Sequence, residues 1–267
     1  MLTLANLQNS LLHDIIKYLL AAGVLALLLW IGRDRLQGRR LQARRPTASD
    51  LRREIGWSLT TASLFACASL LGIFWVARQG WSQLYWDLQQ HSLSYAGFSL
   101  LLMIVAHDAY FYWTHRLLHR PRLMRWSHRL HHLSRTPTPW TAYAFHPSEA
   151  LVQTAFPILF ALVVPMHPLI LLLWSIHMIV RNVLGHCGHE LMPHWMIRSG
   201  WFDWLTTTTT HHDLHHQFGR YNYGLYFTWW DRWLGTEHPE YRTCLERAAG
   251  LTGSPVAASP TAQPTTY

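Results

Sequence analysis

Clusters of histidine stand out in this sequence because their spacing repeats. Two stretches have the pattern HxxHH, in which the first histidine lies three and four residues before the other two. They contain His128, His131 and His132 in one case, and His212, His215 and His216 in the other. Residues three and four apart share one face of a helix. At this chain's histidine frequency, template counting predicts roughly 0.1 copies of HxxHH per chain, so chance does not explain two.

Two further pairs of histidines lie near these patterns. His115 and His119 are four residues apart, and His186 and His189 are three apart. For the clustered histidines we expect metal binding, because a metal satisfies ring nitrogens that would be costly to bury alone. For isolated histidines we expect packed or interfacial side chains, and these are His13, His91, His167, His177, His194 and His238.

The number of clustered histidines exceeds what one structural metal needs. A structural zinc takes four ligands, usually with cysteines among them, whereas the three cysteines here form no paired motif. We therefore expect two metal ions. Imidazole suits iron, zinc, copper and nickel, so the residues alone leave the metal open. The predicted ligands are His115, His119, His128, His131, His132, His186, His189, His212, His215 and His216, with a supporting role beside the metal as the alternative for His189.

Polar residues near the clusters are candidates to orient the ligands by accepting hydrogen bonds from their ring N–H groups. Asp108 is the best placed, because it precedes His115 by seven residues, two helical turns back on nearly the same face. The other candidates lie within or beside the patterns, and they are His146, Glu149, Glu190, His211 and Asp213.

Apolar segments of membrane-spanning length are expected to position these clusters. Half of the 267 residues are hydrophobic and 13% are charged, against about 25% in soluble domains. Segments 11–31, 57–77 and 93–113 are each about 20 residues long, enough to cross a hydrocarbon core of roughly 30 Å. The apolar region 150–184 is interrupted by three prolines. There we expect a helical hairpin that enters and leaves on one side, with two short full spans as the alternative.

The distribution of arginine predicts how the chain is oriented. Eight arginines lie between residues 33 and 53, whereas the loop 79–90 carries almost no positive charge. Arginine-rich loops face the cytoplasm. Counting crossings from there places everything after Trp113 on the cytoplasmic side. The predicted fold is an all-α integral membrane protein, a transmembrane helical bundle with a cytoplasmic helical cap that holds a histidine-rich dimetal site.

The predicted organisation has three parts. Residues 1–56 form a transmembrane helix and a basic cytoplasmic loop, 57–249 form the catalytic membrane domain, and 250–267 form a disordered tail rich in Pro, Thr, Ala, Gly and Ser. The net charge of +8 does not predict nucleic-acid binding, because the arginines do not form a stripe interleaved with aromatics. A metal transporter or sensor is the non-enzymatic alternative, but it predicts ionisable ligands inside the spans, and most clusters lie outside them.

The order of the histidine patterns resembles that of the fatty acid hydroxylase and sterol desaturase superfamily. Its signature is an HxxxH box, an HxxHH box, a lone histidine after a hydrophobic hairpin and a second HxxHH box. The resemblance runs from about Arg52 to Tyr241. Two flanking segments, Thr136–Pro147 and Tyr221–Arg232, are similar to the lathosterol oxidase branch, the carbon-5 sterol desaturases.

The resemblance implies an enzyme with two iron ions that activates molecular oxygen with electrons from an external donor and oxidises a C–H bond of a lipid. The product is an alcohol or a double bond, and no catalytic residue is implied beyond the ligands. A sterol-like lipid is the expected substrate, with a fatty acyl, sphingolipid, carotenoid or hopanoid-type lipid as the alternative. The chain has no CxxCH haem motif, so a separate cytochrome b5-like protein, ferredoxin or reductase is expected as partner. The expected location is a bacterial inner membrane or the endoplasmic reticulum.

Overall fold

The computed structural model describes residues 3–252, which form helices, short turns and two isolated β-bridges, with no strand in that range. Five longer helices make a bundle: α1 (Leu4–Ile31), α3 (Ala48–Arg78), α4 (Leu93–Leu118), α7 (Pro147–Val163) and α8 (Pro168–Gly185). The shorter ones are α2 (Arg33–Leu36), α5 (Pro121–Leu123), α6 (Arg129–His132), α9 (His194–Ser199), α10 (Phe202–Leu205), α11 (Thr209–Phe218), α12 (Trp229–Trp233) and α13 (Tyr241–Ala248).

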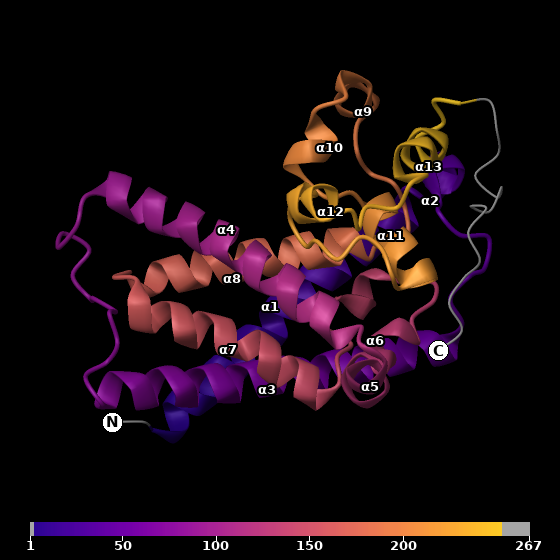
Figure 1. Cartoon of the computed structure of the whole chain (residues 1–267). Coiled ribbons are helices and arrows are strands. Elements are labelled where there is room, and N and C mark those ends of the chain that lie inside the picture. Colours follow the sequence, from indigo (N-terminus) through magenta and orange to yellow (C-terminus); the bar gives the residue numbers. More distant parts are fainter. Residues whose placement is uncertain (1–2, 253–267) are drawn as a thin grey trace.

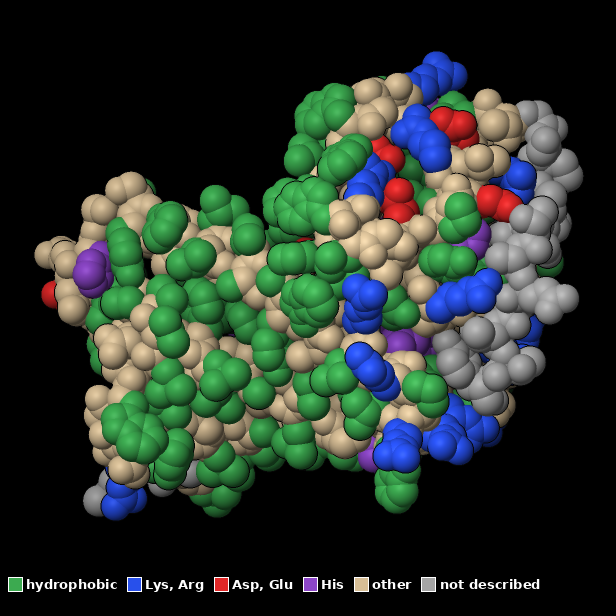
Figure 2. All heavy atoms as spheres, in the orientation of Figure 1, with side chains coloured by type: hydrophobic (Ala, Val, Ile, Leu, Met, Phe, Trp, Pro, Cys, Tyr) green, Lys and Arg blue, Asp and Glu red, His purple; other side chains and the backbone are tan. Residues whose placement is uncertain are grey.

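Four of the longer helices, α1, α3, α4 and α8, are long and apolar enough to cross a membrane. The three spans expected from the sequence lie within α1, α3 and α4, and the prediction of an all-α membrane bundle is confirmed. Large hydrophobic side chains remain exposed on the outer faces of these helices, such as Leu27 at 53% and Leu101 at 59%. Figure 2 shows this apolar surface along the bundle. In a bilayer these side chains face lipid, where exposure carries no hydrophobic cost.

The region 150–184 forms the expected hairpin, α7 and α8, joined by a turn at 164–167. Pro147 and Pro168 stand at the first positions of the two helices, where a missing N–H costs nothing, and Pro157 lies inside α7. The turn pairs with the segment between α3 and α4, where the Tyr85 N–H donates to the Met166 carbonyl at 3.2 Å. The hairpin therefore reaches the far end of the bundle, which favours the alternative of two short spans over a partial entry.

The short helices gather at the opposite end of the bundle and form a cap (Figure 1). The arginine-rich segment after α1 contacts this cap: Arg39 donates to the Met192 carbonyl at 2.6 Å, and the Gln42 amide donates to Asp213 at 2.6 Å. The arginines and the histidine clusters therefore share one end of the molecule. The disordered tail predicted at 250–267 lies, beyond residue 252, outside the described residues.

Candidate metal centre

Nine of the ten predicted histidine ligands form two compact groups at the junction of the bundle and the cap. In each group the facing ring nitrogens all lie within 4.8 Å of one another. The first group contains His115, His119, His128, His132 and His215, and the second contains His131, His186, His212 and His216. Such ligand sets suit two metal ions, one per group.

Four parts of the chain supply these side chains. His115 is in the last turn of α4 and His119 follows it as the C-terminal cap. The first HxxHH box spans a π-helical turn and α6, the second lies in α11, and His186 caps the end of α8. In each box the two histidines four residues apart enter one group, and the third histidine enters the other. Each box therefore supplies ligands to both groups.

The ring nitrogens in these groups face one another at hydrogen-bond distances. In the first group the Nε2 atoms of His115 and His128 are 3.0 Å apart, and those of His132 and His215 are 3.1 Å apart. In the second group the Nε2 atom of His186 is 2.9 Å from that of His212 and 3.2 Å from that of His131.

The partners of the opposite ring nitrogens establish which tautomers face the centre. His115 Nδ1 lies 2.9 Å from the Tyr223 carbonyl, and His128 Nδ1 lies 2.8 Å from the Glu149 carboxylate. A carbonyl or a carboxylate only accepts, so each Nδ1 carries the hydrogen and each Nε2 of a neutral ring presents a lone pair. When Glu149 is ionised, the 3.0 Å contact between these two Nε2 atoms is therefore no hydrogen bond, and a cation between them relieves the repulsion and favours the ionised form.

The same tautomer occurs in two further rings. His186 Nδ1 donates to the Asn182 carbonyl at 2.8 Å, and His215 Nδ1 donates to the Tyr221 carbonyl at 2.7 Å. Burial lowers the pKa of His128, His215 and His216 well below 6.5, and neighbouring imidazoles lower it further. These rings are therefore neutral at neutral pH and can bind metal without first losing a proton.

In the second group, buried ring nitrogens without hydrogen-bond partners in the described part of the chain indicate a site for a cation. Both ring nitrogens of His216 are buried without a hydrogen-bond partner among residues 3–252. A buried ring nitrogen without a partner is costly, and a metal satisfies it. The residues present therefore fit a metal pair.

The Glu149 carboxylate contacts a clustered histidine, His128. Asp108, expected in that role, accepts instead from the backbone N–H groups of Tyr226 at 2.7 Å and Phe227 at 3.3 Å. It therefore anchors the loop 221–228, which carries two of the carbonyl acceptors. Asp108 acts on the ligands through this loop and does not contact them.

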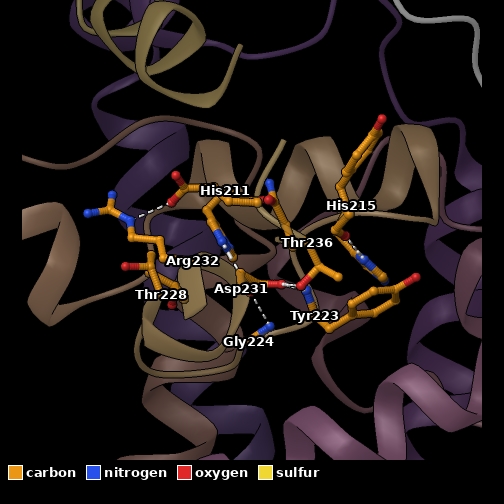
Figure 3. Close-up of polar contacts among 12 residues, drawn as sticks. His211, His215, Tyr223, Gly224, Thr228, Asp231, Arg232 and Thr236 are labelled. Atoms are coloured by element: carbon orange, nitrogen blue, oxygen red, sulfur yellow. Dashed lines mark hydrogen bonds and ion pairs between the residues drawn. The ribbon is translucent and has the colours of Figure 1, made fainter. Parts of the chain in front are cut away.

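The loop 221–228 is held from several sides (Figure 3). Asp231 accepts from the Tyr223 and Gly224 N–H groups, each at 2.8 Å. Asn222 has a positive φ of 59° and donates from its side chain to the His211 carbonyl at 2.8 Å. The turn at Asn222 directs the flanking carbonyls of residues 221 and 223 to two ligands. Sequence reasoning missed these acceptors, because a backbone carbonyl has no residue-type signal.

The remaining supporting candidates hold the surrounding helices in place. His146 caps α7, where its Nδ1 accepts from Ser148, and Glu190 accepts from the Thr210 N–H at the start of α11. His211 Nε2 lies 3.5 Å from Asp231. Asp213 accepts from glutamine amides, those of Gln42 and Gln217, each at 2.6 Å.

His189 lies outside both groups. Its Nδ1 contacts the carbonyl of Cys187 at 3.2 Å, and its backbone pairs with Arg40. Gly188 has a φ of +71°, and this left-handed turn redirects the chain after His186. The spacing of three residues from His186 therefore does not bring the two rings together, because α8 ends at Gly185 and the chain from His186 to His189 is not helical.

A cavity inside the bundle lies next to the histidine groups, and aromatic side chains separate the two. Phe111 and Phe145 line it and lie against ligands, with ring centroids 4.9 Å from His115 and 5.1 Å from His131. Side chains of α3 and α8 that are far from the cap, Ile73 and Leu171, line its other parts. The cavity is thus a mainly apolar space that lies beside the candidate metal centre, behind these two rings.

Together the fold and the site define a class, a helical membrane protein whose cap holds a buried histidine centre suited to two metals. Residues 100–236, half of the chain, match the fatty acid hydroxylase family. The chain belongs to that family, and the resemblance stated from the histidine patterns is confirmed.

Named relatives are sterol-modifying proteins of fungi and mammals. A Delta(7)-sterol 5(6)-desaturase of Gibberella zeae is 34% identical over 59% of this chain and 47% of its own length. Another of Aspergillus fumigatus is 30% identical over 70% of this chain and 63% of its own. Human lathosterol oxidase is 29% identical over 69% of this chain and 60% of its own. The matches thus span less than two thirds of each relative, and no solved structure matches the chain.

Proposed function

We propose that this chain is a membrane-bound, oxygen-dependent lipid oxidase of the sterol desaturase type. The observation that carries the proposal is the convergence of neutral ring nitrogens from four chain segments on two adjacent points, beside an apolar cavity. We propose two iron ions, one bound by each group of histidines. His189 is left out of this ligand set because its ring lies elsewhere.

When bound, a pair of iron ions supplies the redox chemistry that activates molecular oxygen with electrons from a separate donor. The chain holds the ligands in one tautomer through Glu149 and the carbonyls of Asn182, Tyr221 and Tyr223. Burial keeps water from the centre, and the cavity wall holds a lipid so that one C–H bond faces the ring nitrogens. Positioning of this kind is the protein's main contribution in cofactor enzymes.

The proposed substrate is a Δ7-sterol-like lipid that enters from the bilayer. Support comes from the names of the relatives and from the position of the cavity among helices of membrane-spanning length. Desaturation removes two hydrogens from the lipid, whereas hydroxylation adds one oxygen. The mass of the product therefore distinguishes the two reactions, and a redox partner on the cap side supplies the electrons.

The test replaces one ligand from each group, His131→Ala and His215→Ala, and uses His189→Ala as the matched control. We expect about two iron ions per chain in the parent and in the control, measured by plasma mass spectrometry of purified protein. Both ligand variants are expected to insert into the membrane, lose iron and lose conversion of a supplied Δ7-sterol. Full turnover by either ligand variant, or a parent protein that holds another metal when active, contradicts the proposal.

A further inference from the structure

The wall of the cavity contains several polar side chains, and most of them are satisfied within the protein. Thr154 donates to the Ala150 carbonyl at 2.8 Å, and Ser175 donates to the Leu172 carbonyl at 2.9 Å. The Asn182 amide donates to the Ala142 carbonyl at 2.8 Å. These groups have no need of a ligand.

Gln153 differs from them. It lines the cavity and is 8% exposed, yet neither its amide oxygen nor its amide nitrogen has a hydrogen-bond partner within residues 3–252. Its backbone carbonyl also lacks the usual helical donor, because residue 157 is a proline without an N–H. A buried amide without partners costs free energy. A second cavity residue, Trp174, is 6% exposed and has an unpartnered indole N–H as well.

The chemistry of these groups selects the kind of ligand. Gln153 offers both a donor and an acceptor, and Trp174 offers a donor. A hydroxyl group can accept and donate, so it satisfies both kinds of partner, whereas a ketone leaves the amide oxygen unmatched. A carboxylate would need a free cation, but the lysine in the wall, Lys17, is already paired with Asp14. The wall therefore suits a neutral hydroxyl.

We infer that Gln153 binds a hydroxyl group of the lipid substrate and so selects hydroxylated, sterol-like lipids over simple hydrocarbon chains and fatty acids. This inference takes its substrate site from the proposed function. Trp174 is the second donor in the same wall. The rest of the substrate occupies the apolar part of the cavity, toward Ile73 and Leu171.

The position of Gln153 also limits where the substrate is oxidised. Gln153 lies one helical turn, about 6 Å along the axis, from Glu149, which contacts the ligand His128. The hydroxyl anchor is therefore near the metal centre and not at the remote end of the cavity. The oxidised carbon is expected only a few bonds from the hydroxyl-bearing carbon, in the same ring system.

The experiment measures binding without turnover. Purified full-length protein in lipid nanodiscs, loaded with iron and given no electron donor, is titrated with a tritiated Δ7-sterol, with the same sterol lacking its 3-hydroxyl, and with oleate. We expect the hydroxylated sterol to bind about tenfold more tightly than the deoxy form, the fold-change that one hydrogen bond sustains. Gln153→Met keeps the side-chain volume and is expected to abolish this preference. Thr154→Val, at a cavity residue already satisfied, is expected to retain it.

Three results overturn the inference: equal binding of the two sterols by the parent, a hydroxyl preference that survives in Gln153→Met, or tighter binding of oleate. The outcomes separate the inference from the proposed function. Protein that holds two irons and oxidises a lipid, but binds both sterols equally, contradicts only the role of Gln153. Protein that prefers the hydroxylated sterol through Gln153, yet holds no iron and oxidises nothing, contradicts only the proposed function.

Discussion

The acceptor at one ring nitrogen of a histidine determines what the other nitrogen can do. Among the residues described, backbone carbonyls hold His115, His186 and His215 with the Nε2 lone pair facing the centre. A side-chain replacement cannot remove a carbonyl. His128 is held by a carboxylate, that of Glu149, and this contact can be removed by mutation.

Glu149→Ala is expected to weaken iron binding in the first group by about 10- to 100-fold, the usual cost of losing a partner that orients a metal ligand. Without an acceptor, the His128 ring loses its fixed tautomer and its added basicity. Glu149→Gln keeps an acceptor oxygen and is expected to fall between the parent and Glu149→Ala. Competition with a chelator measures the affinity of each purified variant.

Asp213→Asn is the matched control for the Glu149 variants, because Asp213 is also a buried carboxylate near the ligands but bonds to Gln42 and Gln217. It is expected to keep the parent's affinity for iron. An alanine at position 149 that leaves the affinity unchanged would show that His128 needs no orienting partner.

The loop 221–228 positions two of the ligands, because its carbonyls accept hydrogen bonds from His115 and His215. Gly224 is its tightest point: a Cβ added there would lie 2.5 Å from the Phe227 carbonyl oxygen and 3.0 Å from Asp231 Oδ2. The first contact is with backbone, so the loop itself has to move. Such movement displaces the neighbouring Tyr223 carbonyl from His115.

Gly224→Ala is expected to lower the stability by about 1–3 kcal/mol, the usual cost of overpacking, and to reduce the iron content as well. Thermal unfolding and metal analysis of the purified variant measure the two effects. Gly38→Ala is the control, because a Cβ at that position meets nothing within 4 Å. If both variants match the parent, the loop does not position the ligands.

At the scale of elements, the sequence predicted the helices that depend on local pattern. The spans in α1, α3 and α4 follow from runs of apolar residues long enough for a bilayer. Pro157 and Pro168 were taken to interrupt an apolar region, whereas Pro157 lies inside α7 and Pro168 begins α8. The depth of the hairpin depends on the contact between Tyr85 and Met166, which lie far apart in the sequence.

The part of the candidate site that could be predicted from the sequence is the part formed by regularly spaced side chains. The HxxHH boxes indicated that histidines would gather, but not that each box would divide between two groups. Asp108 was placed correctly on the face of His115, yet its partners are backbone N–H groups of a loop more than 100 residues later. His189 fitted the helical spacing, but the turn at Gly188 places its ring outside both groups of histidines.

For the whole molecule, the structure places the arginine-rich segment and the histidine cap at one end and the loop between α3 and α4 at the other (Figure 1). Arg39 and Gln42 bond directly to the cap, so this arrangement does not depend on a count of crossings. The side of the membrane on which the cap lies is a separate question, and the arginines predict the cytoplasmic side.

Single cysteines at exposed positions test that orientation. Gln89→Cys lies in the loop between α3 and α4, and Arg198→Cys lies in α9 of the cap. In a bacterial host, an impermeant maleimide is expected to label position 89 in intact cells and position 198 only after the membrane is opened. The half-buried Cys67 and Cys244 are replaced by serine in both proteins to lower the background, and the remaining native cysteine, Cys187, is buried. The reverse labelling pattern would leave the bundle intact but place the metal centre and its electron donor outside. Labelling of both positions from one side would contradict the bundle, because α4 as a full crossing and an α7–α8 hairpin that returns to its starting side place the two positions on opposite sides.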